Sequence, residues 1–444
     1  MELFLRRYVL QFVGYVVIAS VFGACTWHEP YRTEVVSPPE FKPADPTMLD
    51  HVDIERGENN YLLGFAEFDD QGAFWDRMQV LDHSKGMFHR LMQGIAERDM
   101  LMVVFVHGWQ NNAEYNNGNV KTFRKVLAQL QEDENASPQP RQVIGVYVGW
   151  RGLSLFGTVL TQLTFFDRKN TAEKVGHGAV TDLLRHIELL RSARTRAHPR
   201  DRLVIVGHSF GGAIVHTALN QILVDRFIEA KKASLRGDDA MRFSPRSFGD
   251  LVLLINPAFE AQRYDTLYEI DAAPHRPYEG QLPIYAILTS ESDWATGYAF
   301  PIGRWFSTFF EKHKDGQEKR RNRQTIGHYD LYKTHKLVLA PDSSPEVEGS
   351  DEDPPTVMSR SADLQGIVPM AQQAWMARSA NTPCDWEQQY ESTVLKHVCD
   401  QSRVPVNSPY LVVEVSPDVI DGHNDIDNPH MLSFVRAFIL SSLP

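Results

Sequence analysis

The 444-residue sequence lacks the motifs by which several large classes of protein are recognised. It contains no P-loop, no His-Glu-x-x-His motif and no paired Cys-x-x-Cys motif, and no internal repeat recurs at the period of a solenoid. We therefore expect neither a metal ion nor a nucleotide cofactor. No stripe of lysine and arginine dominates the sequence, and the formal net charge is -12. Because nucleic-acid phosphates demand clustered cations, a nucleic-acid partner is not expected.

Cysteine is also scarce, with Cys25, Cys384 and Cys399 as the three in the sequence. Without Cys25, the other two form an even pair separated by a short polar stretch, and they could close a disulfide loop. Two buried thiols are the alternative, because sequence spacing alone does not establish that the two Cα atoms are close.

The chain begins with a segment that is typical of an export signal. Arg6 and Arg7 precede an apolar run over residues 8–24. Small residues before Cys25 resemble the processing site of a bacterial lipoprotein, although Phe22 departs from the usual aliphatic residue. A lipidated Cys25, a cleaved secretory signal, an uncleaved membrane anchor and a buried core helix all remain open, because the segment is only marginally long enough to span a bilayer. The first three place the body of the protein outside the cytoplasm, and we expect a cell-envelope protein held to the membrane by its N-terminus.

Composition divides the rest of the chain into a tether and one large domain. Residues 26–58 are rich in proline and polar residues, so we expect a tether without regular structure. Residues 59–444 have enough length and apolar content for a large folded domain. The stretch over residues 300–408 is longer than a normal crossover and changes character several times, and we interpret it as an insertion. Its basic segment at residues 312–323 is either a solvated face or a contact for anionic head groups.

A strand, a sharp turn and a helix are predicted around Ser209. The apolar run over residues 203–206 enters the turn Gly207–Gly212, which reads Gly-His-Ser-Phe-Gly-Gly, and an amphipathic helical pattern follows over residues 213–223. Such a turn holds its serine in strained backbone geometry and exposes the hydroxyl at the carboxyl end of the strand. There the amino end of the following helix favours negative charge. An ordinary serine in a glycine-rich turn is the alternative interpretation.

These residues resemble the nucleophile elbow of the α/β-hydrolase superfamily. Phe105–Trp109 resembles the oxyanion strand and loop of that superfamily, and the order of the two motifs along the chain is also right. The stretches Gly149–Gly152 and Leu163–Lys169 resemble uncharacterised bacterial members of unknown substrate. The resemblance implies a mostly parallel central sheet flanked by helices, with the long insertion before the last strand. It also implies that the backbone N–H groups of Trp109 and Phe210 form the oxyanion hole.

The catalytic partners of Ser209 are expected after later strands. Asp293 follows the apolar run at residues 284–288, and His423 lies between the last predicted strand and the last predicted helix. This gives the order serine, acid, histidine that is typical of α/β-hydrolases. Glu260, which follows the preceding strand, is the alternative acid. The weaker candidates for the base are His430 and His328.

The predicted activity is that of a serine hydrolase acting on a carboxylic ester, of which a lipid-like ester is one form, through an acyl-enzyme intermediate. An acyltransferase would use the same intermediate. A catalytically silent envelope protein that keeps the fold as a binding scaffold is the alternative from a different class.

Overall fold

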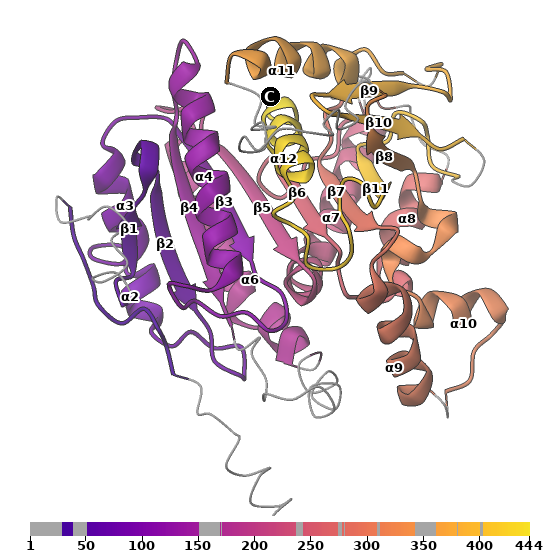
Figure 1. The fold of residues 1–444 in the computed structure, drawn as a ribbon, viewed down its shortest axis with the longest axis horizontal. Helices are drawn as coiled ribbons and strands as arrows, with labels where there is room; N and C mark the ends of the chain where they lie inside the picture. Colours follow the sequence, from indigo (N-terminus) through magenta and orange to yellow (C-terminus); the bar gives the residue numbers. More distant parts are fainter. Residues whose placement is uncertain are drawn as a thin grey trace, which may run out of the picture.

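The computed structural model describes residues 29–38, 51–150, 169, 171–236, 243–273, 278, 280–308, 311–341, 361–379, 381–399 and 403–444. Within these residues an eleven-stranded sheet has the order β1-β2-β4-β3-β5-β6-β7-β11-β8-β10-β9 (Figure 1). The strands are β1 Ile54–Arg56, β2 Leu62–Glu67, β3 Met100–Val106, β4 Gln142–Gly149, β5 Arg202–His208, β6 Leu251–Ile255, β7 Tyr285–Ser290, β8 His335–Leu339, β9 Glu387–Tyr390, β10 Thr393–His397 and β11 Tyr410–Val415.

The central strands are parallel, which confirms the predicted mostly parallel sheet. The strands from β2 to β8 in the spatial order pair in parallel with their neighbours. β1 adds to one edge in the antiparallel sense, and β10 and β9 add to the other edge in the same sense. The expected insertion at residues 300–408 therefore contributes β8, which is the last parallel strand, and β10 and β9, which extend the sheet beyond it in the antiparallel sense.

Helices cover both faces of the sheet. The helices that pack on the sheet are α3 Met87–Ile95, α4 Gly118–Ala136, α6 Ala179–Arg194, α7 Phe210–Arg236, α8 Asp265–Ala272, α11 Ser361–Met376 and α12 Pro429–Ser441. Helices α3, α6, α7 and α8 pack on one face, while α4, α11 and α12 pack on the other (Figure 1). The smaller elements include α2 Arg77–Leu81, α9 Phe300–Ser307, α10 Gly316–Arg323 and the short helical turns η1 Glu58–Asn60, η2 Ala261–Tyr264, η3 Ala295–Ala299, η4 Ile326–His328 and η5 Asp330–Tyr332.

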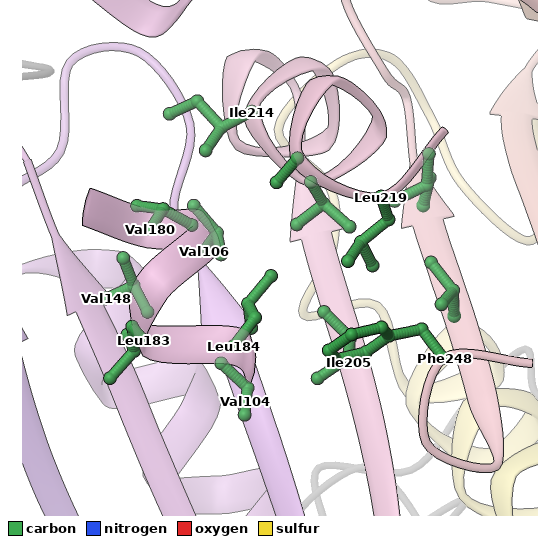
Figure 2. Packing of buried hydrophobic residues seen from close by; sticks show 14 of the residues in the cluster. Val104, Val106, Val148, Val180, Leu183, Leu184, Ile205, Ile214, Leu219 and Phe248 are labelled. Atoms are coloured by element: carbon green, nitrogen blue, oxygen red, sulfur yellow. The ribbon is translucent and has the colours of Figure 1, made fainter. Parts of the chain in front are cut away.

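Alternation along the central strands explains why both faces need helices. Val104 of β3 faces the cluster formed with α6 and α7, whereas its neighbours Val103 and Phe105 face the cluster formed with α4. Figure 2 shows the first cluster, in which β3 and β5 residues meet Leu184 of α6 and Leu219 of α7. Because every residue of β3 is apolar and buried, this strand is held in place from both sides.

The expectation of a tether without regular structure over residues 26–58 is wrong for its last part, residues 51–58. Residues 54–56 form β1, which pairs with β2. Asp53 is buried and accepts hydrogen bonds from Arg90, with the closest contact at 2.5 Å. Arg32 is 3% exposed, and its backbone N–H donates to the Glu67 carboxylate at 2.8 Å. The charged side chains of Arg32, Asp53 and Glu55 are therefore buried in ion pairs and hydrogen bonds, which sequence composition does not reveal.

No helix among the described residues is long and apolar enough to cross a bilayer. The signal or anchor expected at residues 1–25, including the candidate lipidation residue Cys25, lies outside the described residues.

Candidate active site

Ser209 is the single residue between β5 and α7. Its φ is 56°, a left-handed conformation that a non-glycine residue adopts only when the surroundings enforce it. The Ser209 N–H donates to the carbonyl of Ile255 at 3.0 Å, and the N–H of Ala258 donates to the carbonyl of Ser209, also at 3.0 Å. A Cβ atom on Gly211 would lie 2.0 Å from the carbonyl oxygen of Val106, so only glycine fits there. The neighbouring strands therefore hold the serine in its strained geometry.

The structure brings the three side chains Ser209, His423 and Asp293 into one line of contacts. His423 lies in the loop between β11 and α12, and its Nε2 is 2.7 Å from the Ser209 Oγ. Its Nδ1 is 2.8 Å from the Asp293 Oδ2. Because a carboxylate only accepts, Nδ1 carries the proton, and Nε2 of the neutral ring is free to accept the serine proton.

Asp293 is buried and ionised. It follows β7 and is 1% exposed. Burial alone would raise its pKa, but hydrogen bonds and charge from His423, together with hydrogen bonds from Thr296, leave the pKa below its usual value. Thr296 donates its backbone N–H to Oδ1 at 3.1 Å and its hydroxyl to Oδ2 at 2.5 Å. The carboxylate is thus fixed in orientation by bonds on both oxygens.

Glu260, the alternative acid, is held in a separate cluster of ions. Its carboxylate lies 2.5 Å from the ammonium of Lys169 and 3.0 Å from the guanidinium of Arg304. Burial would raise the pKa of Glu260, but these two cations lower it below its usual value. The structure therefore places Asp293 against His423 and commits Glu260 to these two cations.

The backbone of His423 is clamped by two residues that the sequence analysis did not single out. Its carbonyl accepts a hydrogen bond from His208 Nε2 at 3.0 Å and another from Asn256 Nδ2 at 3.0 Å. Asn256 Nδ2 also donates to the carbonyl of Gly422 at 3.2 Å, and its Oδ1 accepts from the Ser290 N–H at 2.9 Å. Asn256 is fully buried with a φ of 44°. This asparagine thereby joins the ends of β6 and β7 to the loop that carries His423.

His208, the residue before Ser209, is neutral. It is 1% exposed, and burial followed by the nearby His423 lowers its pKa to about 3. Since its Nε2 contacts a carbonyl oxygen, that nitrogen carries the proton and donates. A neutral His208 can hold the loop without placing a positive charge beside His423.

The oxyanion-type loop lies directly against the serine. A Cβ atom on Gly108 would be 2.7 Å from the Ser209 Cβ, so a side chain there would collide with the serine. The rings of Trp109 and Phe210 meet edge to face with centroids 6.4 Å apart, so the two expected backbone donors belong to residues that are in contact. His107 is structural: its Nδ1 donates to the carbonyl of Gly108 at 2.8 Å, and its Nε2 accepts from the N–H of Trp150 at 3.0 Å.

The other candidate histidines lie elsewhere. His328 Nε2 is 3.1 Å from the hydroxyl of Thr296, so it stands behind Asp293 and not beside Ser209. His430 Nδ1 is 2.8 Å from the hydroxyl of Ser392. Neither therefore takes the place of His423 against the serine.

Cys384 and Cys399 form a disulfide, with Cα atoms 5.5 Å apart. Two groups of side chains have spacing that suits a metal ion: the first consists of these cysteines with His397, and the second of Asp99, His198 and Asp201. The sulfur atoms of the first group are bonded to each other. In the second, Asp99 pairs with Arg200 at 2.5 Å and Asp201 pairs with Arg194 at 2.8 Å. Both groups are thus engaged in bonds within the protein.

The comparison with protein families agrees with this geometry. The model of the alpha/beta hydrolase family matches residues 103–398, which is more than half of the chain. The chain belongs to the alpha/beta hydrolase family. The matched part of this hydrolase-fold protein contains Ser209 and Asp293 and ends before His423, which the three-dimensional structure brings to them. No curated protein and no solved structure matches the chain.

Proposed function

We propose that this alpha/beta hydrolase is a serine hydrolase that cleaves a carboxylic ester through an acyl-enzyme. The observation that carries the proposal is the continuous contact from the Ser209 Oγ through the His423 ring to the Asp293 carboxylate. A serine hydroxyl is a weak nucleophile at neutral pH unless a base takes its proton as it attacks. Asp293 is ionised, so it can orient the imidazole and stabilise its charged form.

The proposed reaction has two halves. His423 Nε2 takes the Oγ proton while Oγ bonds to the carbonyl carbon, and the carbonyl oxygen becomes an oxyanion that faces the N–H groups of Phe210 and Trp109. The charged imidazole then protonates the leaving alcohol as the carbon–oxygen bond breaks. Water then attacks the acyl carbon while the same nitrogen takes its proton, and the imidazolium returns that proton to the Ser209 Oγ as the bond between Oγ and the acyl carbon breaks, which releases the acid.

Replacement of Ser209 by alanine tests this proposal. Turnover of a p-nitrophenyl ester should fall by about a millionfold in kcat, because the nucleophile is lost while the fold stays intact. His430→Ala is the matched control, since this histidine lies outside the line of contacts, and its turnover should remain near that of the unaltered protein. Turnover retained in Ser209→Ala would contradict the assignment of the nucleophile.

We also propose that the protein resides in the cell envelope and is attached to the membrane by its N-terminus. The export-type segment before Cys25 and the disulfide between Cys384 and Cys399 support this, since disulfides persist mainly outside the cytoplasm. If Cys25 is lipidated, the mature protein lacks residues 1–24 and Cys25→Ser blocks the processing. An unchanged mature N-terminus in that variant, measured by mass spectrometry, would indicate ordinary signal cleavage, and retention of Met1 would indicate an anchor.

A further inference from the structure

Four large apolar side chains form an exposed row immediately after Asp293. Trp294, Tyr298, Ile302 and Trp305 are 59%, 66%, 56% and 44% exposed. Trp294 is the N-cap residue of the π-helical turn η3, Tyr298 lies on η3, and Ile302 and Trp305 lie on α9. Their spacing of four, four and three residues places them on one helical face. We call these four residues the α9 stripe.

The α9 stripe reverses the usual polarity of a helix in a water-soluble protein. Phe300 and Thr296 are buried on the opposite face, and Arg304, also on that face, reaches inward to the buried carboxylate of Glu260 at 3.0 Å. A surface helix ordinarily turns its apolar residues to the core and its charges to water. Contiguous apolar side chains on the outside of a folded protein mark a surface that another apolar phase or partner covers.

A basic helix is attached to the α9 stripe. The Arg304 Nε donates to the carbonyl of Asn322 at 3.1 Å, and the Arg323 Nε donates to the hydroxyl of Thr308 at 3.2 Å, so α10 is fixed to the end of α9. Residues 311–323 contain six lysines or arginines against three acidic residues, in a chain whose formal net charge is -12. Figure 1 shows α9 and α10 projecting together from the body of the protein. The exposed cations are Lys312, Lys314, Lys319 and Arg320.

We propose that the α9 stripe and α10 dock on the surface of a bilayer that contains anionic lipids. Tryptophan and tyrosine are favoured at the boundary between head groups and acyl chains, because their rings are apolar and their polar atoms remain wet. Exposed lysine and arginine are attracted to anionic head groups. A second copy of the chain fits this surface less well, because a two-fold interface would bring the two basic α10 helices together.

Docking would place the catalytic residues near the lipid surface, because Trp294 directly follows Asp293 in the chain. With the proposed esterase function, the substrate would then be an ester drawn from the bilayer. The docking itself rests on the α9 stripe and α10 and does not depend on that function.

The experiment uses the full chain in phosphatidylcholine vesicles with and without phosphatidylglycerol, with bromine on the lipid acyl chains to quench nearby tryptophan fluorescence. Trp294→Phe keeps an apolar side chain and removes one fluorophore. Quenching should be greater in the unaltered protein than in Trp294→Phe, and this difference should shrink without phosphatidylglycerol or at high salt. Replacing Lys319 and Arg320 by glutamine should weaken docking by roughly fivefold per cation.

A second pair of variants separates loss of docking from loss of folding. The double variant Tyr298→Asp with Ile302→Asp should lose the Trp294-dependent quenching. The control double variant Leu189→Asp with Leu235→Asp changes residues of α6 and α7 that are 69% and 77% exposed, and it should keep that quenching. Thermal unfolding verifies the fold of each. Equal quenching of the unaltered protein and Trp294→Phe in anionic vesicles would overturn the proposal. The docking proposal would also be overturned, in favour of a second copy, if the protein formed a concentration-dependent dimer in which Trp294 is protected from acrylamide but is not quenched by the brominated lipid.

Discussion

Removing the side chain of Asn256 should displace His423 although His423 itself is unchanged. The Asn256 amide supports the carbonyls of His423 and Gly422 and accepts from the Ser290 N–H. Its loss leaves the Gly422 carbonyl and the Ser290 N–H without these partners, while the His423 carbonyl keeps its bond from His208. Ser290 is fully buried, and a buried unsatisfied group costs about 1–3 kcal/mol, so the free energy of unfolding should fall by roughly 2 kcal/mol. A shift of the imidazole by about 1 Å is expected to lower kcat about a hundredfold.

Two replacements at Asn256 separate the amide from the backbone. Alanine and glycine both remove the amide, so they should lower kcat towards a p-nitrophenyl ester equally. Because φ is 44°, alanine should also lower the free energy of unfolding in urea by about 1 kcal/mol more than glycine does. Asn59→Gly is the matched control, since Asn59 has a φ of 57° but lies at the exposed turn η1. A glycine variant at Asn256 with unchanged kcat would refute the argument that this amide positions the base.

Three further predictions concern buried titratable groups. Asp293→Asn should lower kcat by about ten-thousandfold, because the imidazole loses its charged partner. Glu260→Gln should leave kcat within a few-fold and lower the free energy of unfolding by about 3 kcal/mol, because Arg304 and Lys169 lose this buried carboxylate, although Lys169 keeps Glu173 at 3.4 Å. The reverse pattern in steady-state kinetics and urea unfolding would exchange the roles of Asp293 and Glu260. His216 is buried between the Tyr285 hydroxyl and the Arg263 carbonyl, and burial lowers its pKa from 6.5 to about 3. Below about pH 6.5 the unfolded chain therefore takes up a proton at His216 that the folded chain does not. The free energy of unfolding thus decreases as the pH is lowered, and this group accounts for about 2 kcal/mol of the decrease at about pH 5. In the His216→Gln variant, the free energy of unfolding measured by urea titration should decrease by about 2 kcal/mol less between neutral pH and pH 5. An unchanged pH dependence would contradict a neutral His216.

The sheet could be predicted from the sequence because its evidence is local. The apolar runs of β3 and β5 and the turn around Ser209 each specify their structure within a few residues. The order of Asp293 and His423 along the chain also predicts the contact between their side chains. The choice against Glu260 depends on Lys169 and Arg304, which reach its carboxylate from two other elements.

Other features could not be predicted, because they depend on distant partners. Asn256 and the His423 carbonyl that it holds are 167 residues apart in sequence. The charges of Arg32 and Asp53 resemble those of a solvated tether, but the Arg32 guanidinium donates to the carbonyl of Ala113 and lies near Glu55, and Arg90 binds Asp53. Similarly, the apolar spacing of the α9 stripe would usually indicate a core-facing helix, and only the structure shows which side faces outward.

Labelling with a fluorophosphonate is the most direct test of the central claim, that Ser209 is an activated nucleophile. The probe bonds covalently to a serine whose proton a neighbouring base removes, and mass spectrometry of the digested protein identifies the labelled residue. The account predicts a single adduct on the peptide that contains Ser209, slowed strongly in His423→Ala and unaffected in His430→Ala. Failure of the folded protein to react, or an adduct on a serine other than Ser209, would contradict it.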